Sequence, residues 1–400
     1  MPWSETCPME ERARFVLAAL EGWSSITELC EKYGISRRVG YKWLDRYASG
    51  GLVALEDRKR VPRRQAMETP PEVVAKIVEL RQQRPTWGPK KLRARLEHLQ
   101  PEIAWPAPST MGEILRREGL VGKRRRARRP AGAWSSPRTV ADAANRVWTA
   151  DFKGEFRLGN AQLCYPLTVV DAHTRYLLGC QALPGTGARG ARAAFERVFH
   201  GYGLPEVIRT DNGTPFRSRA VGGLSQLAVW WIRLGIRLEW TRPRHPQDNG
   251  AHERMHRTLK AEATKPGRAT AELQQQAFNR FRTIYNQERP HEALHQQTPA
   301  SLYKPSERRV PRRIPDLAYP ESYLQRKINQ HGQLRWRRHS YFVSETLHHQ
   351  RVGLEYTGEG VFNLYFGPVL LGQLNETTRL VKLERDRKPP HPYRVKVLPM

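Results

Sequence analysis

The stretch TDNGTPF, residues 210–216, is the segment around which the rest of the chain is organised. It ends a β-prone run and places Asp211 where that run gives way to a turn. A second acidic residue, Asp151, lies upstream in VWTADFKG, and a third, Glu253, lies downstream in HPQDNGAHERMHRTLK. Mg²⁺ prefers oxygen ligands and shares its coordination with substrate phosphates. Three carboxylates from separate segments of a basic chain therefore indicate a divalent-cation site that meets a phosphate backbone.

Length and charge narrow the class of protein. A chain of 400 residues predicts two to four domains, because a single core rarely grows beyond about 250 residues. Lysine and arginine total 68 against 39 acidic residues, and the net charge of +29 predicts a polyanionic partner bound in a salt-dependent way. No apolar run approaches the roughly 20 residues that span a bilayer, so no membrane partner is expected. The four cysteines lack CxxC spacing, which favours reduced thiols in a cytoplasmic protein.

The three acidic segments resemble the catalytic core of DDE transposases and retroviral integrases. The matched residues are Asp151 in WTADF, Asp211 in TDNGTPF, and Glu253 shortly after the pair Asn249-Gly250. The flanking segments resemble a bacterial insertion-sequence transposase more than a viral enzyme. The resemblance implies that the three acids are catalytic and hold two Mg²⁺ ions per active site, with Mn²⁺ as a possible substitute. It also implies cleavage of element ends and their joining to target DNA.

Residues 145–265 predict an α/β domain, with three strands followed by alternating helices and strands. This is the element order of the ribonuclease-H-like fold that the resemblance implies, in which the strands of Asp151 and Asp211 are neighbours. Asp171 in VVDAHTR is a rival carboxylate, but at a strand-to-turn junction it more often bonds local backbone or Arg175. Asp248 is the rival third acid, and its Pro- and Gly-containing loop suits a fixed ligand less well than the helix that Glu253 opens.

The basic helix that follows Glu253 carries a second set of candidates. Arg257 and Lys260 share a face with Glu253 at spacings i+4 and i+7. Intrahelical salt bridging is the plainer interpretation of this spacing. The resemblance implies instead that the two cations bind the donor DNA end. His252 and His256 are weaker candidates for phosphate contacts.

Residues 9–48 are typical of a helix-turn-helix unit. Ser36 is expected to cap a helix whose Val39 and Trp43 face inward. Because such proteins read DNA with the start of the second helix, the outward residues are DNA-binding candidates. They are Arg37, Arg38, Tyr41 and Lys42. The alternative is a structural bundle with a solvated basic face.

Two further regions are expected to handle DNA. Residues 72–121 repeat the helix-turn-helix theme, with Pro89 in a first turn and Ser109 as a cap. The most basic run, residues 122–140, is interpreted as an arm that orders on DNA, with a targeting tag as the weaker alternative. Its DNA-binding candidates are Lys123, Arg124, Arg125 and Arg126.

The expected architecture is multidomain α+β. The domains, in order, are a helix-turn-helix domain at 1–54, a basic linker at 55–71, a second helix-turn-helix domain at 72–121, a basic linker at 122–140, a ribonuclease-H-like integrase core with trailing helices at 141–305, a linker at 306–322 and a small β-barrel at 323–400. The expected partners are double-stranded DNA, as element ends and as target, and further copies of the chain on that DNA. The expected location is the bacterial cytoplasm, at the nucleoid. A non-catalytic DNA-binding protein, such as a repressor or domesticated transposase, is the main alternative, and a ribonuclease-H-like nuclease or resolvase is the second.

Overall fold

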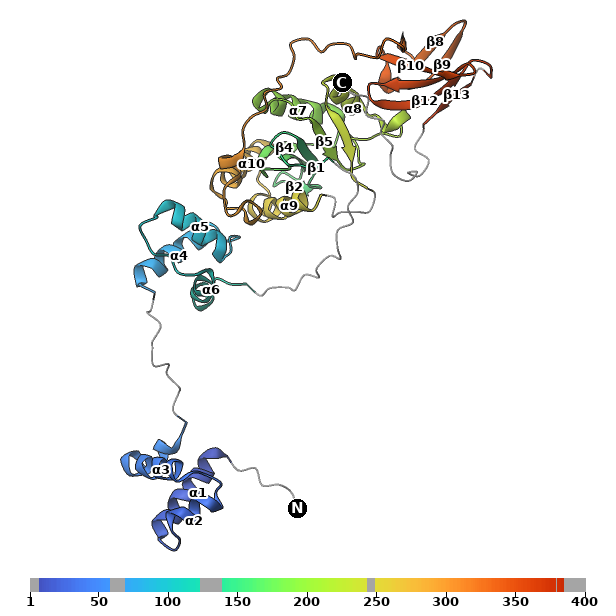
Figure 1. The fold of residues 1–400 in the computed structure, drawn as a ribbon. Coiled ribbons are helices and arrows are strands. Elements are labelled where there is room, and N and C mark those ends of the chain that lie inside the picture. Colours follow the sequence, from blue (N-terminus) through green and yellow to red (C-terminus); the bar gives the residue numbers. More distant parts are fainter. Residues whose placement is uncertain (1–6, 58–68, 123–138, 243–248, 379, 385–400) are drawn as a thin grey trace. The chain divides into compact units, whose positions relative to one another are not determined.

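The computed structural model describes residues 7–57, 69–122, 139–242, 249–378 and 380–384. The chain divides into two compact units, Met1–Thr69 and Pro70–Met400 (Figure 1). Among the helices of the described residues, none is long and apolar enough to cross a membrane.

The first unit is a small helical bundle. Its elements are α1 (Pro8–Glu21), α2 (Ile26–Lys32), α3 (Arg37–Gly50) and the 3₁₀ turn η1 (Leu52–Leu55). Ser36 caps α3 as expected, since its hydroxyl accepts a hydrogen bond from the Val39 amide at 3.4 Å. Within α3, a Cβ at Gly40 would lie 2.7 Å from the Cys30 sulfur and 3.0 Å from the Phe15 ring. A glycine there therefore lets α3 pack closely on α1 and α2, and the expected helix-turn-helix arrangement is present.

The second unit begins with three more helices. These are α4 (Pro71–Gln83), α5 (Pro89–Leu99) and α6 (Pro108–Arg117). Pro89 opens α5 as expected, but Ser109 does not cap α6. The helix begins at Pro108, two residues before the start that a Ser109 cap implies. Proline already has the helical φ and needs no amide partner in the first turn. The bundle packs around the fully buried Trp87.

A mixed β-sheet forms the centre of the second unit. Its strands are β1 (Val147–Phe152), β2 (Phe156–Arg157), β3 (Leu163–Asp171), β4 (Leu177–Leu183), β5 (Val207–Thr210) and β6 (Arg237–Trp240). The order is β2-β3-β1-β5-β6, with β4 on β3, and β1 is parallel to β5. The first of the three strands expected at the start of this domain is divided into two, β1 and β2. Gly154 separates them with a φ of 86°, a left-handed conformation that interrupts a strand.

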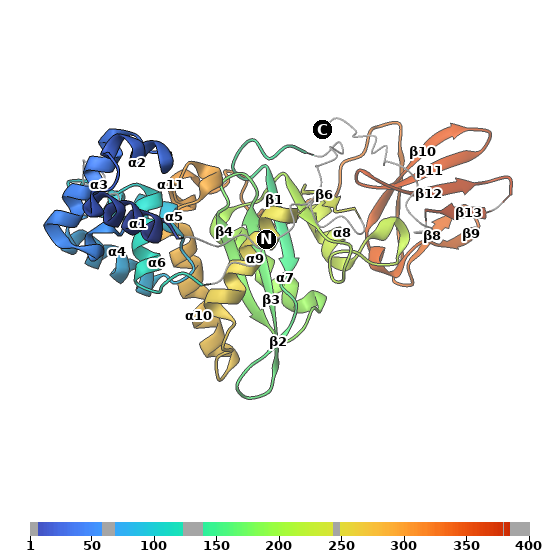
Figure 2. The same ribbon diagram turned by 90° about the horizontal axis from the view of Figure 1, so that it is seen from below.

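Helices cover both faces of this sheet (Figure 2). They are α7 (Ala188–Tyr202) and α8 (Gln226–Arg233) on one face, and α9 (Gly250–Ala263) and α10 (Ala271–Thr283) on the other. Successive side chains of a strand point to opposite faces. In β1, Trp148 and Ala150 therefore join the core under α7 and α8, while Thr149 contacts α9. Asp151, two positions after Thr149, lies on the α9 face.

Short elements follow α10. They are the π-helical turn η4 (Ile284–Glu288), the 3₁₀ turn η5 (Glu292–Leu294) and α11 (Pro299–Leu302). This segment contacts the helices at the start of the second unit: Arg84 pairs with Glu288 at 2.6 Å, and Ile284 packs on the core around Trp87. Residues 72–121 therefore pack against the segment that follows α10.

The last part of the described chain is an antiparallel sheet. Its elements are β7 (Leu324–Lys327), β8 (Gln333–Trp336), β9 (His339–Phe342), the 3₁₀ turn η6 (Glu345–Leu347), β10 (Arg351–Gly358), β11 (Val361–Phe366), β12 (Val369–Asn375) and β13 (Leu380–Leu383). Five strands pair in the order β13-β12-β11-β10-β7, and β8 pairs with β9. The short 3₁₀ turn η2 (Val221–Gly223) and α8 contribute to the same core, through residues such as Ile232. An all-β region is present here, and its closure into a barrel stays a prediction.

Candidate active site

Two of the predicted acids lie at the same edge of neighbouring strands. Ala150 of β1 is the register partner of Thr210 of β5 in a parallel pair. Asp151 and Asp211 each come directly after one of these partners. The strands are thus neighbours, as the resemblance implied, and the two aspartates follow matched positions. β5 ends one residue before Asp211, so this acid stands at the start of the following turn.

The turn TDNGTPF is held by one local bond and one buried ring. The Gly213 amide donates to Asp211 Oδ1 at 3.1 Å. A Cβ at Gly213 would lie 3.0 Å from the other carboxylate oxygen, so a side chain there would crowd the acid. Phe216 is 1% exposed and its ring centroid lies 5.7 Å from that of Phe152. The core therefore anchors the far end of the turn.

The electrostatics couple the three acids. Burial, followed by the negative charge of Asp211 and more weakly that of Glu253, raises the pKa of Asp151 to about 7. Burial also raises the pKa of Asp211. A carboxyl whose neighbours are also carboxylates is costly to ionise without a cation. These residues therefore suit an oxygen-liganded divalent ion in chemistry and in charge.

The third acid comes from helix α9 and not from a strand end. Glu253 is exposed in the first turn of α9. Among the described residues, no group of three or more His, Cys, Asp and Glu side chains is arranged to hold a metal ion. Convergence of Glu253 with Asp151 and Asp211 at ligand distance therefore remains a prediction. Asp248, the rival third acid, lies outside the described residues.

The face of α9 has the expected distribution of side chains. Glu253, Arg257 and Lys260 are exposed, and the apolar side of the helix is buried against the sheet. Lys153, just beyond β1, adds a cation that was not among the predicted site residues. Burial and the charge of Lys260 lower the pKa of Lys153, so the two cations are close enough to interact. Positive charge therefore gathers beside Asp151.

The two histidines of α9 do not face phosphate, and that prediction was wrong. His252 and His256 are 2% and 7% exposed. The Thr168 hydroxyl lies 2.7 Å from Nε2 of each ring, and the Thr149 hydroxyl lies 2.8 Å from His252 Nδ1. Burial lowers the pKa of both histidines, that of His256 to about 3, so both rings are neutral. The spacing of four residues places both histidines on one face of α9, opposite Thr149 of β1 and Thr168 of β3. This spacing is the sequence signal that could have indicated a shared packing role.

This buried network joins α9 to the strand of Asp151. Thr168 also donates to the Asp151 carbonyl at 3.1 Å, and His256 Nδ1 lies 3.8 Å from the Asp151 carboxylate. The helix that carries Glu253 is thus connected to the strand that carries Asp151 through Thr168.

Thr168→Val is expected to lower the free energy of unfolding by about 2–4 kcal/mol, because it leaves buried ring nitrogens without their partner. Urea unfolding of both proteins measures the change. Thr283→Val removes a comparable hydroxyl at an exposed helical position and is expected to change stability by less than about 0.5 kcal/mol. Equal effects of the two substitutions would contradict a structural role for the network.

Asp171 has the local role that was expected of it. It is fully buried and accepts hydrogen bonds from the amides of Asn145 and Thr174, at 2.7 and 2.8 Å, and from the Thr174 hydroxyl at 2.7 Å. These bonds occupy its oxygens and join the turn after β3 to the segment before β1. Asp171 therefore serves the fold at this turn.

The predicted DNA-reading residues are exposed at the start of α3, where a helix-turn-helix protein presents them. They are Arg37, Arg38, Tyr41 and Lys42. Trp43 is 8% exposed and faces the bundle core, as expected. The basic candidates Lys123, Arg124, Arg125 and Arg126 lie outside the described residues.

Models of known families match both the helical and the α/β parts of the chain. A helix-turn-helix domain matches residues 11–64, and a homeodomain-like domain matches residues 39–115. Integrase core domains match residues 141–246 and residues 234–299. The first of these two ranges contains both aspartates, and the second contains Glu253.

Relatives include proteins of bacterial insertion elements. The 31.7 kDa protein of insertion element IS407 from Burkholderia multivorans is 28% identical over 231 residues, which are 58% of this chain and 80% of that protein. The 39.2 kDa protein of IS476 from Xanthomonas euvesicatoria is 31% identical over 236 residues, which are 57% of this chain and 63% of the relative. Among solved structures, the catalytic core of HTLV-2 integrase in complex with magnesium matches 40% of this chain and 98% of that one, with 17% identity and a TM-score of 0.33.

Proposed function

We propose that this chain, which belongs to the insertion-sequence transposases with helix-turn-helix domains and a retroviral-integrase-like core, cuts the ends of its mobile element and joins them to target DNA. The observation that carries the proposal is the placement of Asp151 and Asp211 after paired residues of parallel strands. The raised pKa of Asp151 supports a cation site there. Glu253 is proposed as the third ligand and third catalytic acid.

The chemistry follows from these residues. Magnesium, for which manganese would substitute, supplies charge neutralisation and positioning for an in-line phosphoryl displacement when two ions are bound. Asp151, Asp211 and Glu253 would offer the oxygen ligands. Arg257 and Lys260, on the same face of α9 as Glu253, would bind phosphates of the donor end.

Two displacements would use the same arrangement. In the first, a water oxygen bonds to phosphorus at the element end, and the 3′ oxygen leaves as a 3′-hydroxyl group. In the second, that hydroxyl bonds to a phosphorus of target DNA, and the target's 3′ oxygen leaves. In each step one P–O bond forms as another breaks, so the incoming oxygen replaces the leaving oxygen directly and no covalent bond to the protein is required.

The remaining parts would bring the DNA to this site. The exposed residues at the start of α3 would read the terminal inverted repeats, and the basic run at 122–140 would follow the backbone. The C-terminal sheet, closed into a small barrel, would contact DNA or another subunit. The chain would act as a homo-oligomer on two element ends, in the bacterial cytoplasm at the nucleoid.

The decisive experiment combines the protein, pre-cut element ends, a plasmid and magnesium, followed by sequencing of the joints. Element 3′ ends joined to plasmid strands, with a target duplication of constant length, are the expected result. Nicked DNA without joints would indicate a nuclease or resolvase. Bound but uncut DNA would indicate a repressor or domesticated transposase.

The double substitution Arg37→Ala/Arg38→Ala is expected to weaken binding to the terminal repeats by roughly ten- to hundredfold, because a base or phosphate contact of this kind is worth about 1–3 kcal/mol. Footprinting and titration measure the loss. Arg14→Ala/Lys32→Ala removes the same charge from exposed positions of α1 and α2 and is the matched control. An unchanged footprint for the α3 variant would remove this helix from DNA recognition.

A further inference from the structure

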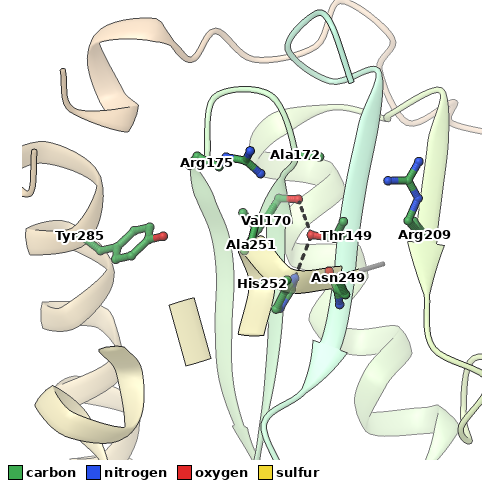
Figure 3. Close-up of a pocket in the computed structure, with 10 residues that line it drawn as sticks. Thr149, Val170, Ala172, Arg175, Arg209, Asn249, Ala251, His252 and Tyr285 are labelled. Carbon is green, nitrogen blue, oxygen red and sulfur yellow. Dashed lines mark hydrogen bonds between the residues drawn. The ribbon is translucent and has the colours of Figure 1, made fainter. Parts of the chain in front are cut away.

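A pocket of about 180 Å³ lies beside the proposed active site, on the α9 face of the sheet (Figure 3). We name it the α9 pocket. Its walls are the middle of β1 and the end of β3, the turn after β3, β5, the start of α9 and the π-helical turn η4. The chemically distinctive residues among those that line it are Thr149, Arg175, Arg209, Asn249 and Tyr285. None of the predicted catalytic acids lines it.

One wall presents a tyrosine hydroxyl group to the pocket. Tyr285 is only 6% exposed, and its hydroxyl makes no hydrogen bond with any residue that the structure describes. In Figure 3 this hydroxyl points from η4 toward the β3 and α9 walls. Burial raises the pKa of Tyr285 to about 12, so the group keeps its proton and can donate it in a hydrogen bond. A protonated tyrosine hydroxyl that opens onto the pocket is available to donate to an acceptor bound there.

A positive charge faces the same space. Arg175, on the turn after β3, makes no side-chain hydrogen bond or ion pair with any residue that the structure describes. Its nearby acid, Asp171, is already occupied by Asn145 and Thr174. On the opposite wall, the Arg209 guanidinium is paired with Glu239 at 2.8 Å, so that pair adds little net charge. The unbalanced charge of the pocket therefore comes from Arg175.

The start of α9 adds backbone donors. This helix has 14 residues, and its N-cap, Asn249, makes no side-chain capping bond. The amide groups of the first turn, at Gly250, Ala251 and His252, have no partner within the helix. They line the pocket at the positive end of the helix dipole. Arginine, a tyrosine hydroxyl and free amides are all donors, and no carboxylate lines the pocket.

We propose that the α9 pocket binds one backbone phosphate of DNA, with Arg175, Tyr285 and the first amides of α9 as donors. A phosphate ester is an anion with several acceptor oxygens, and the pocket is several times the roughly 30 Å³ that one water occupies. The proposal rests on the proposed function, because it takes the substrate to be DNA. It adds a specific anchor: Ala251 is two residues before Glu253, so a phosphate held here would fix the strand beside the third acid.

The salt dependence of DNA binding tests this assignment with the full chain and an element-end duplex. Arg175→Gln is expected to lower the slope of log K against log salt by about 0.9, the value for one phosphate contact, and to weaken binding roughly tenfold. Tyr285→Phe keeps the buried ring and is expected to weaken binding about three- to tenfold at an unchanged slope. Arg189→Gln, at an exposed position of α7 on the opposite face of the sheet, is expected to match the wild type.

An unchanged slope for Arg175→Gln and an unchanged affinity for Tyr285→Phe would overturn the proposal. A second experiment measures thermal unfolding of the wild type and of Arg175→Gln in inorganic phosphate. Suppose that phosphate stabilises only the wild type, while both proteins bind DNA with the same slope of log K against log salt. The pocket would then bind a free anion, and the assignment to DNA would be wrong. Melting curves without phosphate establish that each variant is folded. The joining assay with wild-type protein tests the proposed function, and absence of joining would reject that function. The salt dependence of DNA binding tests the phosphate site independently of joining.

Discussion

Asp211→Asn is expected to abolish strand joining, by roughly a thousandfold or more, while binding to element ends stays close to that of the wild type. An amide keeps the size of the side chain but loses the negative charge that favours a divalent ion. Loss of such a ligand removes several kcal/mol of transition-state stabilisation, and about 1.4 kcal/mol corresponds to tenfold in rate. Sequencing of joints formed in magnesium measures the effect, and a gel-shift titration of the same ends measures binding.

A matched control for this variant is Glu196→Gln, which neutralises an acid on α7, over the opposite face of the sheet. It is expected to join DNA at the wild-type rate. Joining by Asp211→Asn at more than about a tenth of the wild-type rate would reject Asp211 as a metal ligand. Loss of end binding by the same variant would mean that the acid acts in DNA recognition instead.

Asp151→Asn is expected to stabilise the metal-free protein at pH 8 and to have little effect near pH 4. The folded pKa of Asp151 is about 7, against an ordinary value of 3.8. Between these values the folded chain holds a proton that the unfolded chain has released, so stability falls as pH rises toward 7. Above that pH the ionised carboxyl destabilises the fold by an amount on the order of 4 kcal/mol, which the amide removes. Urea unfolding in a chelator at both pH values measures the difference.

The exposed Asp316, paired with Arg351 at the surface, provides the control for the pH experiment. Asp316→Asn is expected to change stability by less than about 1 kcal/mol at either pH. Magnesium at pH 8 is expected to stabilise the wild type more than Asp151→Asn, because a bound ion stabilises only the state that holds it. A wild type that is as stable as Asp151→Asn at pH 8 in chelator would contradict the electrostatic account of this site.

Local sequence signals located most elements of the fold. Ser36 and Pro89 mark the starts of two helices, because a cap and a first-turn proline act through the nearest few residues. The same kind of signal failed at Ser109, where the preceding proline competes for the same position. It also failed at Gly154, where one residue with positive φ divides a strand whose alternation otherwise continues.

For the candidate site too, the sequence indicated some features and not others. The acidic motifs indicated Asp151, Asp211 and Glu253, because carboxylates in a basic chain and their resemblance to a known core are visible along the sequence. Hydrogen bonds between side chains that are distant in the sequence could not be predicted from it. His252 was expected near phosphate and is instead bonded to Thr149 and Thr168, residues 103 and 84 positions away.

By itself, the sequence indicated the helix-turn-helix units, most strands and helices of the core, and the carboxylates that are proposed as ligands, because periodicity, caps and residue type are local properties. Only the tertiary structure decided that β1 lies parallel to β5, that the α9 histidines are buried, and that Arg175 and Tyr285 share a pocket with the first turn of α9. The physical reason is that burial and hydrogen-bond partners depend on which distant segments meet. A polar side chain has the same one-letter symbol whether it is bonded in the core or free to bind a ligand.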